Sequence, residues 1–132
     1  MSFQCIIVAP EQQLMDETVT QVILPAEDGL LGVLTGRSPL LARLGLGELR
    51  IDLPDGQKRQ YLVEGGVAQM KDNKLTILTN AAWAPSQLDA SAAKAEYDEA
   101  VNRPTADQKA ADERNRAMRR ARMKEQMAAV KT

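Results

Sequence analysis

The chain has 132 residues, of which 44 % are hydrophobic but only 3 % aromatic, and its formal net charge is −1. This length allows one domain, or a small domain with an appendage, whose single modest core is packed by aliphatic side chains and alanine. A net charge near zero argues against nucleic acid as a partner. No stretch approaches the roughly 20 apolar residues of a membrane-spanning helix, so we expect membrane association only through partners.

The residue types that most often carry catalysis are scarce. The chain has no histidine and a single cysteine, Cys5, which lies in the apolar run of residues 3–8, where burial is expected. A lone cysteine forms no internal disulfide, which fits a reducing compartment. Clusters of metal ligands and carboxylate calcium loops are also absent from the sequence. These observations leave little basis for catalysis and provide no candidate catalytic residue and no metal site.

The first part of the chain is predicted to be a series of short strands. Residues 3–9 are aliphatic, and residues 14–24 are rich in β-branched side chains, before an expected turn at residues 25–29. In residues 48–53, Leu49, Ile51 and Leu53 alternate with charged side chains, which is typical of a half-buried strand. Further strands are expected at residues 58–64, 67–70 and 75–79, separated by turn signals at 54–56, 65–66 and 71–73.

Residues 29–41 form the most unusual segment, because glycines, a proline and aliphatic side chains alternate within it. Glycine allows tight turns and close approach of another backbone, so short strands joined by turns are expected here. A phosphate-binding loop is the alternative for residues 32–38. That motif needs four residues between its glycines and then a lysine, whereas three residues separate Gly32 from Gly36 and Arg37 follows.

The composition changes near Pro85. From Asp89 onward the chain is rich in strong helix formers and lacks glycine. Residues 102–104 interrupt this run, and residues 105–108 have the form of a capping box that restarts a helix. We therefore predict a β sandwich, a flattened antiparallel barrel of short strands, in residues 1–87, followed by a C-terminal α-helical hairpin in residues 88–132. One long kinked helix is the alternative for the second part.

Small residues dominate the apolar stripe of the predicted hairpin. These are Ala106, Ala110, Ala117, Ala121 and Ala128. Because burial of alanine contributes less free energy than burial of leucine, we expect a marginally stable hairpin that is able to detach.

The same segment carries the one concentration of positive charge in the chain. Its members are Arg114, Arg116, Arg119, Arg120, Arg122 and Lys124. One interpretation is a solvated helix face, where cations near the C-terminus complement the helix dipole. The other is a basic arm that docks on an acidic protein surface.

Two motifs resemble the epsilon subunit of F-type ATP synthases. The segment from Gly29 to Leu41 matches G-x-L-G-x-x-x-G-x-x-P-L-L, and Tyr61 to Val67 matches Y-x-x-x-G-G-x. The two motifs stand in the order and at the distance found in that family. Family members usually have histidine and alanine where this chain has Arg37 and Ser38.

The resemblance implies a non-catalytic central-stalk subunit at the cytoplasmic face of the bacterial plasma membrane. Its sandwich would contact the gamma subunit and the c-ring, and its helices would inhibit ATP hydrolysis by inserting between the alpha and beta catalytic subunits. The contact residues it implies for the c-ring and gamma are Asp28, Gly29, Leu30, Thr35, Gly36, Arg37 and Ser38. The basic residues Arg114 to Lys124 become the inhibitory helix. A stand-alone nucleotide sensor or interaction module, and a small β-sandwich enzyme, are the alternatives.

Some members of that family bind ATP on the hairpin through [IL]-D-x-x-R-A and further arginines. Leu88 and Asp89 match its opening, and Arg116 and Arg120 match arginines of the second helix. Ala92 and Glu99 stand where ATP-binding members have arginine. Only half of the site remains, so the resemblance implies weak or absent ATP binding and no cofactor.

Overall fold

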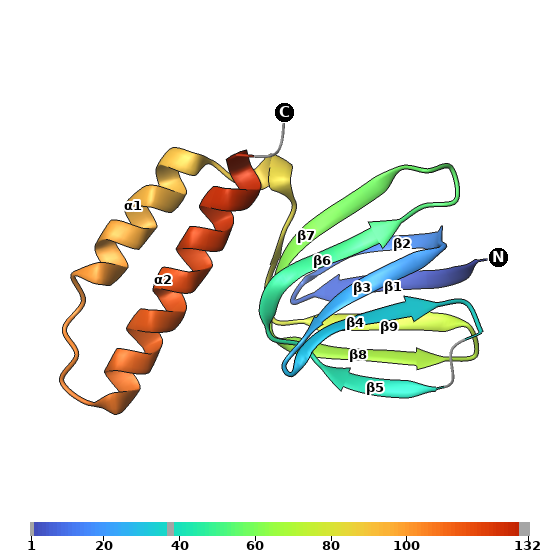
Figure 1. Ribbon diagram of the computed structural model, residues 1–132, viewed down its shortest axis with the longest axis horizontal. Helices are drawn as coiled ribbons and strands as arrows, with labels where there is room; N and C mark the ends of the chain where they lie inside the picture. The colour runs from blue at the N-terminus through green and yellow to red at the C-terminus, as the bar shows by residue number, and fades with distance from the viewer. Residues whose placement is uncertain (1, 37–38, 130–132) are drawn as a thin grey trace. The chain divides into compact units, whose positions relative to one another are not determined.

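The computed structural model describes residues 2–36 and 39–129, which belong to two compact units, Met1–Trp83 and Ala84–Thr132. The first unit is built of strands and the second of helices (Figure 1). The sequence places the domain boundary after residue 87, a few residues further along the chain.

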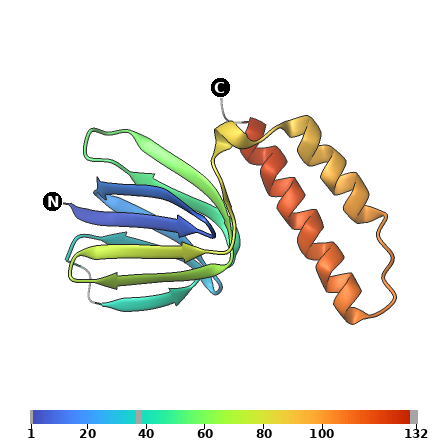
Figure 2. The ribbon, with the colours of Figure 1, turned by 180° about the vertical axis from the view of Figure 1, so that it is seen from behind.

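The first unit is a sandwich of two five-stranded sheets (Figures 1 and 2). Sheet A has the order β2 (Gln12–Val19), β1 (Phe3–Ala9), β9 (Lys74–Thr79), β8 (Gly66–Lys71), β5 (Leu40–Arg43). Sheet B has the order β10 (Ala82–Trp83), β7 (Lys58–Glu64), β6 (Leu46–Asp52), β3 (Gln21–Ala26), β4 (Gly29–Leu34). The predicted sandwich is confirmed, with one difference: β1 and β9 pair in parallel.

The core between the sheets follows the alternation of the strands. In β6, Leu49 and Ile51 are fully buried, whereas Arg50 between them is exposed, as predicted. Burial of such a side chain contributes about 1.5–3 kcal/mol. The largest side chains that are fully buried are all aliphatic or methionine: Ile7, Leu24, Leu44, Leu49, Ile51, Leu62, Met70, Leu75 and Ile77.

Two of the predicted turns are shorter than expected. Asp72 and Asn73 form a two-residue turn in which both residues have positive φ, 53° and 60°. This conformation suits a tight hairpin and is tolerated best by Asn, Asp and Gly. The turn expected at residues 25–29 is confined to residues 27 and 28, because β3 continues to Ala26 and β4 begins at Gly29.

Gly66 belongs to the predicted turn at residues 65–66 and is the first residue of β8. Its position leaves no room for a side chain. Its φ is +116°, and a Cβ atom placed there would lie 2.1 Å from the carbonyl oxygen of Leu78. Any larger residue would force β8 away from β9.

The second unit is a hairpin of two helices preceded by the short 3₁₀ helix η1 (Pro85–Gln87). α1 (Ala90–Val101) and α2 (Gln108–Ala129) pack against each other, and residues 102–107 connect them. The prediction of two helices is confirmed, and the single kinked helix is excluded.

The start of α2 differs in detail from the predicted capping box. The carboxylate of Asp107 accepts a hydrogen bond of 2.8 Å from the backbone N–H of Ala110. Asp107 therefore caps the helix in place of Thr105, as aspartate commonly does at an N-cap.

Small residues line the contact between the helices. Ala93 and Ala100 of α1 are buried, as are Ala117, Ala121 and Ala128 of α2. The predicted stripe thus exists in the C-terminal two thirds of α2, whereas Ala110 is half-buried and Ala106 is exposed ahead of the helix.

Candidate partner-binding site

The residues expected to contact the c-ring and gamma lie at the β3–β4 turn and at the end of β4. Asp28 ends the turn and Gly29 begins β4, and Gly29 and Gly36 have positive φ of 133° and 77°, which favours glycine. Neither glycine has an atom near the place where a Cβ would stand. Backbone is therefore open to a partner at both positions. Arg37 and Ser38 lie outside the described residues.

Thr35, which is also among the expected contact residues, forms a hydrogen bond within the sandwich. Its hydroxyl lies 3.1 Å from the carbonyl oxygen of Ser2 and 3.1 Å from the side-chain oxygen of Asn73. The hydroxyl has one proton to donate, so it bonds either to residue 2 ahead of β1 or to the β8–β9 turn. Thr35 thus positions the segment, and its expected contact with a partner stays a prediction.

Three leucines are exposed on the edge strands of the two sheets, two on the outer face of sheet B and one on the outer face of sheet A. β4 ends sheet B and β5 ends sheet A. Leu30 and Leu34 of β4 have 78 % and 56 % of their surface exposed, and Leu41 of β5 has 73 %. Edge strands, the outermost strands of a sheet, usually carry charged residues in soluble proteins, and these prevent pairing with other chains. An uncharged, leucine-rich edge strand such as β4 is typical of a protein-binding surface.

The outer face of sheet A adds an apolar row to these edge strands. Leu78 of β9 is 48 % exposed and stands directly opposite Val8 of β1 and Val67 of β8. The sequence analysis missed this row. The sequence of residues 75–79 could have predicted it. Leu75 and Ile77 face the core, and because side chains alternate along a strand, Leu78 faces outward.

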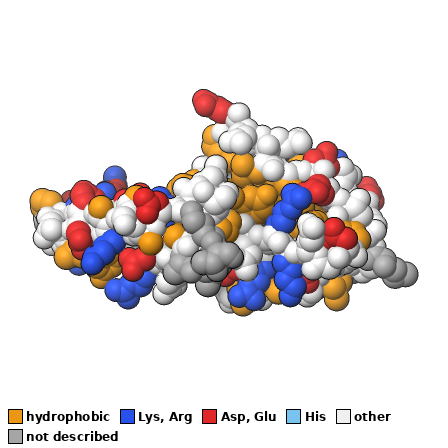
Figure 3. Space-filling model, turned by 90° about the horizontal axis from the view of Figure 1, so that it is seen from above, with side chains coloured by type: hydrophobic (Ala, Val, Ile, Leu, Met, Phe, Trp, Pro, Cys, Tyr) orange, Lys and Arg blue, Asp and Glu red, His pale blue; other side chains and the backbone are white. Residues whose placement is uncertain are grey.

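The six basic residues of α2 do not form one face. Arg116, Arg119 and Arg122 are exposed, whereas Arg114, Arg120 and Lys124 are half-buried. The side chain of Lys124 is only 12 % exposed, and its ammonium lies 3.2 Å from the carboxylate of Glu96 on α1. Acidic and basic side chains lie next to one another over the helices in Figure 3. Only the exposed arginines are placed to meet an acidic partner directly.

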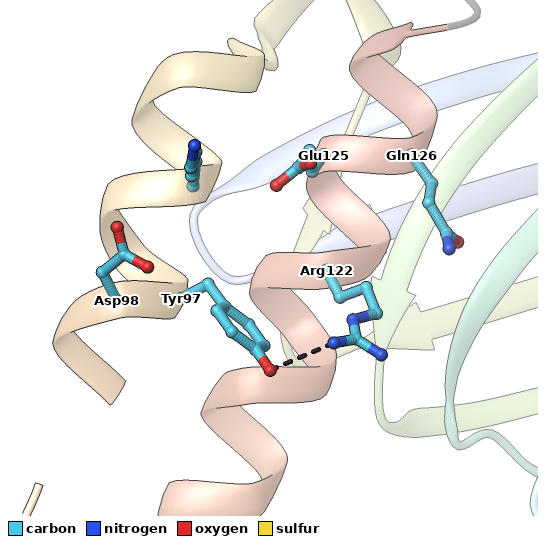
Figure 4. A pocket seen from close by; sticks show the side chains of 6 residues that line it. Tyr97, Asp98, Arg122, Glu125 and Gln126 are labelled. Atoms are coloured by element: carbon cyan, nitrogen blue, oxygen red, sulfur yellow. Dashed lines mark hydrogen bonds between the residues drawn. The ribbon is translucent and has the colours of Figure 1, made fainter. Parts of the chain in front are cut away.

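Arg122 also contacts α1. Its guanidinium donates a hydrogen bond of 3.0 Å to the hydroxyl of Tyr97, and its central carbon lies 5.1 Å from the ring centroid (Figure 4). The two side chains adjoin a surface cavity of about 490 Å³. Its other lining residues are Lys94, Asp98, Glu125 and Gln126. Two cations and two carboxylates surround this space, so it offers no excess of positive charge for a triphosphate.

Leu88 and Asp89, which match the opening of the ATP-binding motif, have structural roles. Leu88 is buried, and the carboxylate of Asp89 accepts a hydrogen bond of 3.0 Å from the N–H of Ser91, which caps α1. Arg116 is exposed and Arg120 half-buried on α2.

Glu99, which stands where ATP-binding members have arginine, is paired with a cation of the same hairpin. Arg103 donates hydrogen bonds of 2.7–3.0 Å to both of its oxygens. This hydrogen bonding to Arg103 lowers the pKa of Glu99. Arg103 thus offsets part of the repulsion expected between Glu99 and a phosphate.

The described residues offer no metal-binding cluster of His, Cys, Asp or Glu. Burial, with a smaller contribution from the charge of Asp16, raises the pKa of the Cys5 thiol to about 12. A thiol with this pKa is protonated at neutral pH and is a poor nucleophile. Among the described residues, no helix is long and apolar enough to cross a membrane.

Residues 2–85 match the family model of the ATP synthase delta/epsilon chain β-sandwich domain. The chain belongs to this family. The ATP synthase epsilon chain of Rhodopirellula baltica is 39 % identical over 122 residues, which cover 92 % of this chain and 94 % of that one. The chloroplastic ATP synthase epsilon chain of Pyropia yezoensis is 38 % identical over 101 residues, covering 76 % of this chain and 75 % of the relative.

Solved structures share the epsilon-chain fold. A chain of the Euglena gracilis mitochondrial ATP synthase OSCP/F1/c-ring structure superposes with a TM-score of 0.84 at 22 % identity, covering 98 % of this chain and 81 % of that one. A chain of the Tetrahymena thermophila mitochondrial ATP synthase central stalk/c-ring structure gives a TM-score of 0.67 at 16 % identity, covering 95 % of each chain. At these identities the likeness describes the fold.

Proposed function

We propose that this epsilon-family chain is a rotor subunit of the central stalk of an F-type ATP synthase. In this role it catalyses no reaction itself. It binds the gamma subunit and the polar loops of the c-ring, and transmits ion-driven rotation to ATP synthesis by the alpha and beta subunits. It lies at the cytoplasmic face of a bacterial plasma membrane and is held there by these partners.

The leucines exposed on the two edge strands are the observation that carries this proposal. Leu30, Leu34 and Leu41 leave much apolar surface in water, which is unfavourable at about 25 cal/mol per Å² unless a partner covers it. The apolar row of Val8, Leu78 and Val67 lies on the outer face of sheet A, the face that also carries Leu41, and the next position of the row on β5 is Arg43. The open backbone at Gly29 and Gly36 suits the close approach of a polar loop.

The hairpin is proposed to inhibit ATP hydrolysis by docking on the catalytic subunits. The exposed Arg116, Arg119 and Arg122 supply the positive charge for an acidic surface. ATP binding by the hairpin is proposed to be weak or absent, because Ala92 and Glu99 replace arginines and the cavity beside Tyr97 and Arg122 carries balanced charge. A stand-alone nucleotide sensor is the alternative function.

A pull-down with purified gamma subunit tests the proposal. Leu41→Ser should weaken binding, because burial of each CH₂ group contributes about 0.8 kcal/mol and serine removes most of the apolar surface at this position. Val101→Ser is a matched control, since Val101 is also exposed but lies at the end of α1. Retention of gamma binding in a Leu30, Leu41 and Leu78 triple serine variant would contradict the proposed surface.

A further inference from the structure

The sulfur atoms of the chain differ in their access to solvent. Cys5 is fully buried, with a thiol that stays protonated. Met15 and Met70 lie in the core of the sandwich, and Met127 is buried in the hairpin. Met118 and Met123 of α2 are half-buried. Oxidants in solution therefore reach sulfur on α2 more easily than in the described part of the sandwich.

Met118 has the more distinctive surroundings of the two. It lines a surface cavity of about 210 Å³ together with Tyr97, Asn115, Arg119 and Arg122. A water molecule occupies roughly 30 Å³ in the liquid, so a peroxide molecule of similar dimensions fits. Met118 also stands one helical turn before Arg122, the residue that contacts Tyr97 of α1. The cavity thus brings a small oxidant to a sulfur beside the contact between the helices.

We propose that Met118 is a site of reversible oxidation by hydroperoxides, and that its sulfoxide loosens the hairpin. The thioether sulfur attacks one peroxide oxygen, so the O–O bond breaks and an S–O bond forms. Sulfur loses two electrons, and the other peroxide oxygen leaves with a proton as water or an alcohol. Enzymatic reduction of the sulfoxide restores the thioether.

Packing near Met118 contributes little to the stability of the hairpin, so a small perturbation is enough to loosen it. The adjacent positions on the buried face are Ala117 and Ala121, whose burial contributes little free energy. Oxidation replaces an apolar sulfur by a polar group that requires hydrogen-bond donors. The guanidinium of Arg122 is such a donor, and a bond to the sulfoxide shifts the guanidinium from its position beside the hydroxyl of Tyr97.

Hydrogen peroxide treatment of the full chain tests this inference without any partner subunit. Peptide mapping by mass spectrometry follows oxidation of each methionine, and hydrogen exchange follows the amides of α1, α2 and the sandwich. Met118→Leu removes the sulfur with little change of volume. Met123→Leu is the matched control, because Met123 is half-buried on the same helix but does not line this cavity.

We expect Met118 to be oxidised several-fold faster than Met15, Met70 and Met127. Exchange in both helices should then rise several-fold in the unmodified chain and in Met123→Leu, but not in Met118→Leu. A sulfoxide reductase should reverse the rise. The inference is overturned if Met118 is oxidised no faster than Met70, a result that needs no variant, or if peroxide loosens the hairpin of Met118→Leu to the same extent.

Discussion

Cys5 lies on β1 with its side chain inside the sandwich, where its pKa is raised to about 12 chiefly by burial. The protonated thiol is therefore favoured in the folded state. This contribution to stability is complete below the pKa of the unfolded thiol, about 8.5, and is lost as the pH rises towards 12. We expect native Cys5 to react with a thiol reagent at pH 8 only at the rate of unfolding. Rapid labelling of the folded protein, compared with protein in denaturant, would contradict its burial.

The prediction that the hairpin binds ATP weakly or not at all depends on Ala92 and Glu99, which replace two arginines of the ATP-binding motif. Ala92→Arg adds a cation on an exposed position of α1, and a charge-assisted hydrogen bond contributes about 1.5–3 kcal/mol. This corresponds to roughly a ten- to hundredfold gain in affinity. Glu99→Arg should add to it, although it also removes the partner of Arg103. Calorimetric titration with ATP and magnesium measures both steps.

Micromolar affinity in the unmodified chain would sink this prediction. Ala92→Gln serves as the control, because it lengthens the same side chain without adding charge. Gain of binding in the double variant alone would show that the hairpin has the required geometry and lacks only cations.

At the level of single residues, sequence patterns predicted burial better than pairing. The alternation in residues 48–53 identified Leu49 and Ile51 as core residues, because a strand turns successive side chains to opposite faces. The partners of Glu96 and Tyr97 were not predictable, since Lys124 and Arg122 lie more than two dozen residues away and meet them only when the hairpin closes. The bond between Glu99 and Arg103 follows helical spacing and was open to prediction.

Among the elements, α2 has both a structural role and a proposed inhibitory role. Its half-buried Lys124 pairs with α1, whereas its exposed arginines are proposed to contact the catalytic subunits. Arg116→Ala with Arg119→Ala removes exposed charge while keeping strong helix formers. We expect ATP hydrolysis by the reconstituted complex to rise by a few-fold, with the helix content unchanged by circular dichroism. Arg116→Lys with Arg119→Lys is the control that preserves charge. If hydrolysis stays at the level of the unmodified complex with the subunit bound, these arginines form a solvated helix face.

The limits of the two helices followed from local chemistry. Proline and the residue before it disfavour helix, so residues 102–104 correctly predicted a break. Thr105 and Asp107 are both good capping residues, and the sequence does not say which carboxylate or hydroxyl reaches a free N–H. The choice of Asp107 depends on the path of the connection.

For the whole molecule, the division into two units predicts that the sandwich folds by itself. A fragment ending at Leu88 retains all ten strands and the described leucines of the proposed partner surface. We expect it to melt cooperatively, to bind gamma, and to release any inhibition of hydrolysis in the assembled enzyme. An unfolded fragment, judged by circular dichroism, would refute the independence of the sandwich. Unchanged hydrolysis would refute only the inhibitory role of the hairpin.

The parallel pairing of β1 with β9 has a consequence for synthesis on the ribosome. β1 forms a local hairpin with β2, but its other neighbour begins at Lys74, so β1 must wait until most of the sandwich has been translated. In sheet B, β3, β4, β6 and β7 pair with strands nearby in sequence, and short loops close sooner than long ones. The nascent chain therefore carries a β1–β2 hairpin whose β1 edge stays unpaired while sheet B assembles. Premature release of the chain before β9 emerges would leave this edge free to pair with other molecules.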